Sequence, residues 1–336
     1  MRRSPQRCAV ARAKSFRVAL ALVAICPLGV AAATLESTTL QQTCRNIADE
    51  SVRLACYDAR FGLPERSAPE STDHVRIVRE TREALSRNWL ALTPYKTNYV
   101  LPYTLNADSN FDPYEPAGTD GDELSDAELK FQVSIRALLW PNMFGSDASL
   151  NLAYTQQSYW QLYANEDLSS PFRETDHEPE LLLDFPVEYR VFGLRMRAVT
   201  FGLVHQSNGQ SDPLSRSWNR LTAQATFEKG NFLMTLRPWY RIEEDEEDDD
   251  NPNIERYMGQ MEATFAYKFG TQTVAAIVKN NLRADNKGGV QLDYTFPLFG
   301  HFKGYVQAYS GYGENLIDGD NYVNRIGVGF VLTDWF

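Results

Sequence analysis

The fold is indicated most clearly by residues 290–298, which read VQLDYTFPL. Apolar Val290, Leu292 and Tyr294 are each followed by a polar side chain. Successive side chains of a β-strand point to opposite faces. This period of two therefore predicts a strand with one apolar and one polar face.

The same alternation recurs on both sides of this segment. Residues 219–228, 257–269 and 325–336 show it, and about twelve such segments of roughly ten residues lie between Tyr99 and the C-terminus. A soluble β-sandwich would alternate in the same way. Three features favour a membrane barrel instead: the even number of segments, connections of alternating length, and an aromatic C-terminus.

The connections between the predicted strands are alternately short and long. Tight turns are expected at 192–193, 229–231 and 269–271, each of which contains a glycine. Long polar connections are expected at 107–129, 164–179, 208–218, 243–255 and 314–323. Outer-membrane barrels have short periplasmic turns and long outer loops. The chain also ends in Trp335-Phe336, similar to the terminal aromatic by which exported barrels are recognised for assembly. We therefore predict an all-β fold, a twelve-stranded antiparallel transmembrane β-barrel.

The composition is compatible with such a barrel. The chain of 336 residues has a formal net charge of -11, with 17 tyrosines and 18 phenylalanines, and its mean hydropathy is -0.41. This hydropathy excludes a helical membrane protein, whereas a barrel needs apolar residues only at alternate positions. The acidic balance argues against nucleic acid as a partner, because phosphates require a basic surface.

Residues 1–33 are typical of a secretory signal peptide. A basic N-terminus precedes an apolar run, 18–26, and Ala31-Ala32-Ala33 supplies small residues for cleavage. The apolar run is too short to span a bilayer. Lipidation of Cys26 is a weaker alternative, because Ile25 is a poor residue before a lipidated cysteine.

Residues 34–95 differ in pattern from the rest, and we expect them to form a short periplasmic extension before a barrel domain at 96–336. Cys44 and Cys56 remain after signal cleavage, and an even pair of cysteines in an exported protein predicts a disulfide. A metal site is the alternative, but the two cysteines lack nearby histidines.

A second stretch, residues 205–220, reads HQSNGQSDPLSRSWNR and carries the candidate chemistry. His205 and Ser207 are two residues apart, so both side chains point to the face that carries Leu203. Asn219 begins the next strand on its apolar face, and hairpin pairing would bring it beside the other two. Polar side chains on a lipid-facing wall are costly unless they are paired or used.

A serine, a histidine and a third, orienting residue form a nucleophilic system. The histidine takes the serine proton, and the third residue fixes the tautomer and orientation of the imidazole. Asparagine can orient the ring without placing an unpaired anion beside lipid. The alternative is a polar rim at the membrane interface with no catalytic role.

These motifs and several others resemble the outer-membrane phospholipase A family over roughly residues 96–336. The matching runs are HQSNG (205–209), SDP (211–213), SRSWNR (215–220), SSPFRET (169–175), DDNP (249–252), YSGYGE (309–314) and the C-terminal strand. The resemblance implies a barrel in the bacterial outer membrane, with its site near the outer leaflet. It also implies calcium-dependent hydrolysis of the sn-1 and sn-2 acyl esters of membrane phospholipids and of lysophospholipids, and activation by homodimerisation.

The resemblance also assigns roles to individual residues. By position, Ser207 is the nucleophile, His205 the general base and Asn219 the orienting residue. The main-chain amide of Gly209 is the donor to the oxyanion.

For calcium, the matching positions are Ser169, the carbonyl of Gln210 and the hydroxyl of Ser215. Asp212 and Asp250 resemble the acidic ligands of a second calcium position. Family members often have arginine where Gln210 stands, a change that a carbonyl ligand tolerates. Such oxygen ligands suit calcium. The alternative for Asp250 is a solvated loop, since it ends an acidic run.

A non-catalytic barrel, such as a porin or an adhesin, is the main alternative function. A porin needs an open lumen, whereas charges of both signs on the inward faces would pair across a narrow barrel and close it. These charges are Arg195, Arg197, Arg220, Glu228, Arg237, Glu262, Lys268 and Asp293. A barrel protease would use carboxylates or His-Asp pairs in the outer lumen, which the pattern does not indicate.

Gln156 lies in the middle of the predicted lipid-facing side of strand 149–161, which also carries Leu152 and Tyr154. A primary amide facing hydrocarbon leaves polar groups unsatisfied. We expect a second copy to pair with it across a two-fold axis. The alternative is a Gln156 that faces the lumen because the register is shifted by one residue.

Overall fold

The computed structural model describes Cys56 and residues 92–118, 124–164, 171–247, 249–300 and 302–335. The chain divides into two compact units, Met1–Ala68 and Pro69–Phe336, and every described strand belongs to the second. The predicted signal peptide, the Cys44–Cys56 disulfide and nearly all of the predicted extension lie outside the described residues and stay predictions.

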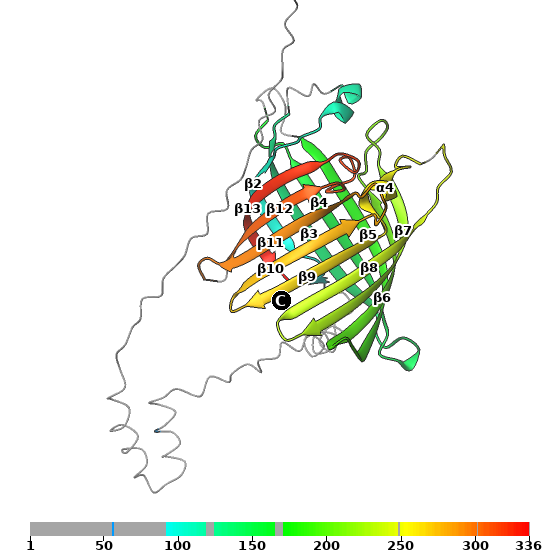
Figure 1. Cartoon of the computed structure of the whole chain (residues 1–336), viewed down its shortest axis with the longest axis vertical. Coiled ribbons are helices and arrows are strands. Elements are labelled where there is room, and N and C mark those ends of the chain that lie inside the picture. The colour runs from blue at the N-terminus through cyan, green and yellow to red at the C-terminus, as the bar shows by residue number, and fades with distance from the viewer. Residues whose placement is uncertain are drawn as a thin grey trace, which may run out of the picture. The chain divides into compact units, whose positions relative to one another are not determined.

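Strands β2 to β13 form the predicted closed barrel of twelve antiparallel strands (Figure 1). Each strand pairs with its neighbours in sequence, and pairing of β2 with β13 closes the ring. A short strand, β1 (Leu92–Pro94), adds to β3 beyond the end of β2. The bounds are β2 (Asn98–Asn106), β3 (Ala127–Trp140), β4 (Ser149–Trp160), β5 (Phe172–Val191), β6 (Leu194–Ser207), β7 (Ser217–Lys229), β8 (Phe232–Ile242), β9 (Met261–Phe269), β10 (Gln272–Asn280), β11 (Gly288–Pro297), β12 (Lys303–Gly311) and β13 (Val323–Thr333).

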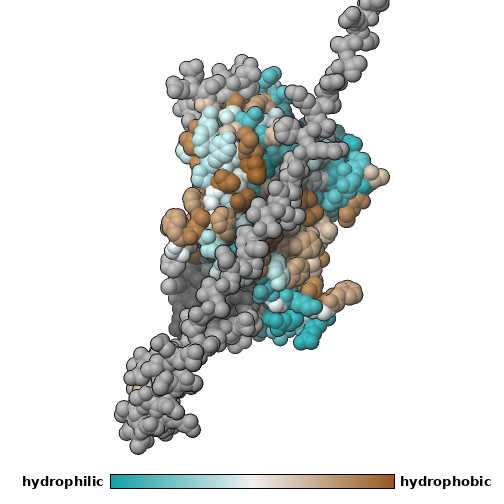
Figure 2. Space-filling model, turned by 60° about the vertical axis from the view of Figure 1, so that its left-hand side comes forward, coloured by the Kyte–Doolittle hydropathy of each residue, from teal (hydrophilic) through white to brown (hydrophobic). Residues whose placement is uncertain are grey.

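The outer face of the barrel wall is apolar, as the alternation predicts. On β11, Leu292 is 52% exposed, whereas Asp293, next to it in sequence, is 4% exposed. Leu203 on β6 and Leu221 on β7 are 49% and 50% exposed. Figure 2 shows brown, apolar side chains on the barrel wall and teal, hydrophilic patches nearer its ends. A polar inner face with an apolar outer face is the pattern of a strand that separates lumen from lipid.

The middle of the lumen is crossed by paired charges. Lys96 Nζ lies 2.7 Å from a Glu178 oxygen and 3.2 Å from a Glu180 oxygen. Arg220 Nη2 is 3.3 Å from Glu178, and Arg237 forms ion pairs with both glutamates. Both glutamates lie on β5, Arg220 lies on β7 and Arg237 on β8, while Lys96 precedes β2. The ion pairs therefore join strands that are not neighbours and occupy space that a pore would need open.

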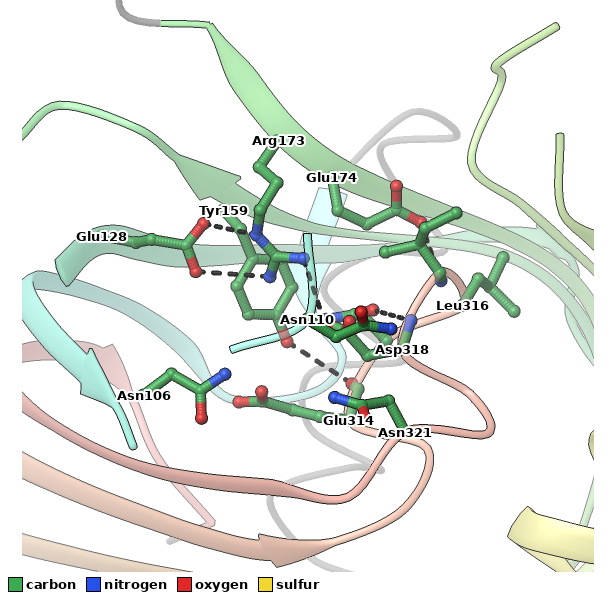
Figure 3. Close-up of polar contacts among 12 residues, drawn as sticks. Asn106, Asn110, Glu128, Tyr159, Arg173, Glu174, Glu314, Leu316, Asp318 and Asn321 are labelled. Atoms are coloured by element: carbon green, nitrogen blue, oxygen red, sulfur yellow. Dashed lines mark hydrogen bonds and ion pairs between the residues drawn. The ribbon is translucent and has the colours of Figure 1, made fainter. Parts of the chain in front are cut away.

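A second group of paired charges lies under the loop between β12 and β13 (Figure 3). Arg173 Nε is 2.6 Å from a Glu128 oxygen, and its Nη1 is 3.0 Å from Asp318 in the loop. Glu314, also in the loop, lies 2.9 Å from Lys130 and 3.0 Å from Arg325. The loop is thereby held inside the barrel mouth.

Glu314 shows why this group is stable as an ionised cluster. Burial raises the pKa of its carboxyl, but the charges of Arg325 and Lys130 outweigh burial and lower that pKa to about 2. A buried carboxylate keeps its charge when opposite charges and hydrogen bonds surround it. The predicted closure of the lumen by charges of both signs therefore agrees with the structure.

Three short helices lie in the described residues: η1 (Asp112–Ala117), η3 (Met143–Gly145) and α4 (Ile254–Met258). None of the three is long and apolar enough to cross a membrane. Helix α4 corrects the strand predicted at 257–269, since β9 begins only at Met261. Ile254 and Met258 are buried in a cluster with Trp218, and this packing overrides the local alternation.

Two further expectations are wrong. The second half of the loop predicted at 164–179 is the start of β5, where Arg173 and Asp176 are buried in the polar lumen. A strand whose inward side chains are charged lacks the apolar contrast that marks other strands. Arg195 is exposed rather than inward, because it lies two residues after the tight turn at 192–193.

The C-terminal residues leave the last strand. β13 ends at Thr333, and Trp335 packs against the buried cluster of Leu233, Ala266 and Ala275. The expectation that Trp335 continues the strand is therefore wrong, and Phe336 lies outside the described residues.

Candidate active site

The β6–β7 hairpin brings the three predicted polar residues to one place on the outer wall. The antiparallel register sets His205 opposite Asn219, and Ser207 opposite Ser217. His205 has the same parity along β6 as exposed Leu203, so it lies on the lipid-facing side. The predicted pairing of the hairpin is thus the one observed.

His205 and Asn219 form a direct side-chain hydrogen bond. The Nδ1 atom of His205 lies 2.9 Å from Oδ1 of Asn219. An amide oxygen can only accept, so the hydrogen lies on Nδ1 and leaves Nε2 free to accept a proton. Asn219 also donates from Nδ2 to a Glu244 oxygen at 2.7 Å, which fixes the orientation of its amide.

Ser207 has a second histidine as a neighbour. His177 on β5 lies directly opposite Ser207, and cross-strand partners project to the same face. The Nδ1 atom of His177 is 2.6 Å from the hydroxyl oxygen of Tyr154. His177 was not predicted as a site residue, because this part of β5 was expected to be a loop. The acidic residues at every second position from Glu174 to Glu180 were the available signal.

The loop after Ser207 is fixed by the buried side chain of Asn208. Its Oδ1 accepts from the amides of Gln210 at 3.3 Å and Arg216 at 3.0 Å, and its Nδ2 donates to the Leu214 carbonyl at 2.8 Å. Gly209 has a φ of 66°, a left-handed conformation that favours glycine. Within the described residues, the Gly209 amide has no hydrogen-bond partner.

Asp250 is tied to the same hairpin. Ser215 Oγ donates to one Asp250 oxygen at 2.6 Å, and the Ser217 amide donates to the other at 2.7 Å. The structure therefore joins two of the predicted calcium ligands and departs from a freely solvated loop. Gln210 and Asp212 are exposed on the connecting loop.

The predicted calcium ligands are not all described. Ser169 lies outside the described residues. Within the described part, no group of three His, Cys, Asp or Glu residues could hold a metal ion. Any calcium here would rely on hydroxyl, carbonyl and water oxygens beside fewer than three carboxylates, a donor set that calcium accepts.

The region beneath the outer loops is packed tightly. Trp218, which lies between Ser217 and Asn219, is fully buried against Trp239 and Leu316. Its indole nitrogen donates to Gln206 at 3.0 Å. This core holds β7 at the level of the candidate site, so the polar residues on its outer face sit on a rigid support.

Comparison with known proteins gives one consistent result. The family model described as Phospholipase A1 matches residues 75–332. Phospholipase A1 of Escherichia coli (strain K12) is 42% identical over 255 residues, which cover 74% of this chain and 84% of that protein. Putative phospholipase A1 of Neisseria meningitidis serogroup B is 33% identical over 357 residues, which cover 90% of this chain and 93% of that protein.

Solved structures give the same match. Outer membrane phospholipase A from Escherichia coli is 41% identical with a TM-score of 0.68, over 73% of this chain and 93% of that one. The Salmonella typhi outer membrane phospholipase was solved as a dimer with bound calcium. It is 40% identical with a TM-score of 0.70, over 76% of this chain and 97% of that one.

Proposed function

Because the chain belongs to the phospholipase A1 family, we propose that this outer-membrane β-barrel phospholipase uses Ser207, His205 and Asn219 as its catalytic triad. Its substrates are the sn-1 and sn-2 acyl esters of membrane phospholipids, and lysophospholipids. The observation that carries the proposal is the hydrogen bond between His205 and Asn219 on the lipid-facing side of the hairpin. An ester in the outer leaflet can reach a site in this position without entering the lumen.

The reaction proceeds in two halves. Ser207 Oγ attacks the ester carbonyl carbon while Nε2 of His205 takes the hydroxyl proton. The bond from the acyl carbon to the glycerol oxygen breaks, and His205 returns the proton to that oxygen. A water molecule then attacks the acyl-serine with His205 again as base, which releases the fatty acid and restores Ser207. In this proposal the Gly209 amide donates to the oxyanion, and its lack of a hydrogen-bond partner among the described residues supports the role.

His205 is a better candidate for the base than His177. The partner of His205 can only accept, so Nε2 of that ring is free to take a proton. The partner of His177 is the Tyr154 hydroxyl, which can donate. When it donates to Nδ1, the hydrogen of the neutral His177 ring sits on Nε2, and that nitrogen cannot act as a base.

Calcium is the proposed cofactor. Ser215 and the Gln210 carbonyl would hold it, with Ser169 contributed by a second subunit, and Asp212 and Asp250 at a second calcium position. When bound, the dication supplies positive charge beside the ester carbonyl. The support is the oxygen donor set around Asp250 and the calcium bound by the Salmonella typhi relative.

The proposed active form is a homodimer, like that of the same relative. Gln156 has the parity of exposed Leu152, which overturns the alternative that it faces the lumen. The expectation that its amide is unsatisfied is also wrong, since it donates to Ser158 at 3.1 Å, and its Oε1 lies 3.3 Å from the Tyr154 hydroxyl oxygen. A dimer contact at Gln156 therefore needs its own test.

That test is Gln156→Leu, measured by calcium-induced cross-linking and activity together. We expect fewer dimers and lower activity, because the amide no longer pairs across the two-fold axis. Dimers that form and turn over like the parent would remove Gln156 from the interface. Leu152→Ile, an apolar change on the same face, is the matched control.

The function itself is tested with purified protein on phospholipid vesicles, with calcium or with a chelator. We expect fatty acid release that requires calcium and is abolished by Ser207→Ala. Channel conductance in a planar bilayer, without hydrolysis, would favour the porin alternative.

A further inference from the structure

One acidic side chain of the loop after β8 is bound to the candidate triad. Glu244 lies two residues beyond the end of β8, and Ile242 at that end pairs with Asn219 on β7. Glu244 Oε1 accepts a hydrogen bond from Asn219 Nδ2 at 2.7 Å. Asn219 in turn contacts His205 through Oδ1 at 2.9 Å. The three side chains form one continuous hydrogen-bonded chain from the loop to the imidazole.

We propose that Glu244 is a positioning residue for the catalytic triad, acting on His205 through Asn219. This inference rests on the proposed function, and it adds a fourth member to the triad. Glu244 touches neither substrate nor reacting atoms in this role.

The first effect of Glu244 is to fix the side-chain amide. An asparagine amide can turn over, which would present NH2 to His205 instead of oxygen. A carboxylate can only accept, so it binds Nδ2 and leaves Oδ1 for His205. The turned amide would place its oxygen against the carboxylate, where the two repel. Glu244 thereby selects the amide orientation in which His205 keeps Nε2 free.

The second effect is electrostatic. Asparagine is neutral, so by itself it stabilises the imidazolium formed during attack less than an aspartate would. A carboxylate hydrogen-bonded to the far side of the amide polarises it and places a negative charge one residue from the ring. Glu244 is half-buried beside a lipid-facing wall, where such a charge is screened less than in water.

The surrounding acidic run does not share this contact. Glu243, Asp245, Glu246 and Glu247 are exposed, and none of them bonds to a described residue of the hairpin. Asp249 pairs with Arg241 at 2.6 Å, away from the triad. Among the described residues of the run, one carboxylate is therefore bonded to Asn219, and several others provide matched controls of the same chemistry.

The test compares Glu244→Ala, Glu244→Gln, Asn219→Ala and the double variant, with Glu243→Ala and Glu246→Ala as controls. We expect Glu244→Ala to lower kcat about tenfold, the scale of a lost charge-assisted hydrogen bond, with KM unchanged. Glu244→Gln keeps an acceptor without the charge, so it should recover part of the loss. In the Asn219→Ala background, Glu244→Ala should have no further effect. The two control variants should match the parent.

Three results would overturn the inference. Parent-like kcat in Glu244→Ala would show that the contact is not used. A further loss in the Asn219→Ala background would show that Glu244 acts independently of Asn219. A raised half-saturating calcium concentration with unchanged kcat would place Glu244 in calcium binding. The heat-dependent shift in electrophoretic mobility of each variant checks that the barrel has folded.

The failure of this inference can be told apart from failure of the proposed function by including Ser207→Ala. An active Ser207→Ala protein would overturn the triad and the role of Glu244 together. An inactive Ser207→Ala beside a parent-like Glu244→Ala would overturn the role of Glu244 alone.

Discussion

The barrel holds two polar regions whose chemistry differs in kind. The lumen contains full charges, such as Arg325 and Glu314, and they are buried as ion pairs. The outer wall carries Ser207, His205 and Asn219, which are partly exposed and make few bonds. In the lumen these charges are matched by fixed partners, as Lys130 and Arg325 are by Glu314, which stabilises the fold. On the wall, the Ser207 hydroxyl and Nε2 of His205 have no fixed hydrogen-bond partner among the residues that the structure describes. Groups that are free in this way can exchange a proton and attack a substrate.

The largest expected effect separates the two regions by activity. Ser207→Ala should lower hydrolysis roughly a thousandfold or more, because the nucleophile is lost. Its thermal unfolding should match the parent, since a single half-buried hydroxyl contributes little to stability. Activity within threefold of the parent would remove Ser207 from the nucleophile role. It would also contradict the distinction between a reactive outer wall and a stabilising lumen.

A substitution in the lumen should have the opposite effect, lowering stability and leaving activity unchanged. Arg325→Met leaves Glu314 and Glu128 without a shared partner, and breaking such a buried pair costs about 3–5 kcal/mol. Heat or urea unfolding in detergent micelles measures the loss, and activity per folded molecule should stay near the parent. Arg256→Met breaks the exposed pair with Asp285 and serves as the control, with little change expected. Equal losses of stability in Arg325→Met and Arg256→Met would contradict the claim that the buried ion pairs of the lumen stabilise the fold.

A smaller effect is expected within the wall region. Asn219→Ala should lower kcat roughly tenfold to a hundredfold, less than Ser207→Ala, because an orienting residue contributes less than the nucleophile. Kinetics on micellar substrate give the value. If Asn219→Ala were as inactive as Ser207→Ala, the orienting role would need revision.

The smallest effect distinguishes the two histidines. His177→Phe keeps an aromatic ring beside Ser207 and should change kcat by less than about threefold, whereas His205→Ala should be as inactive as Ser207→Ala. The same assay applies to both. Loss of activity in His177→Phe with retention in His205→Ala would reverse the assignment of the base.

Much of the wall could be predicted from sequence because lipid imposes a simple rule. Alternate side chains had to be apolar, so the strand containing Leu292 and the pairing of His205 with Asn219 followed from parity. The start of β5 was missed because Arg173 and Asp176 face a polar lumen, where no such rule applies. Helix α4 was missed because its residues pack on Trp218, a contact between distant parts of the chain.

The loop contributions to the site were the least predictable. Glu244 reads as one of several acidic residues in a polar run, and only the position of β8 beside β7 brings it to Asn219. Gln156 was correctly placed on the outer face, but its partners Tyr154 and Ser158 depend on side-chain conformations that spacing does not fix.

The central claim is that Ser207 is an activated nucleophile on the outer wall, and covalent labelling tests it most directly. The folded protein is incubated in micelles with calcium and a long-chain alkyl sulfonyl fluoride, and the modified peptide is located by mass spectrometry. We predict a single modification on Ser207, with loss of activity in proportion, and no labelling of the His205→Ala variant. Modification of another residue in step with inactivation, or full labelling of Ser207 in the His205→Ala variant, would contradict the account.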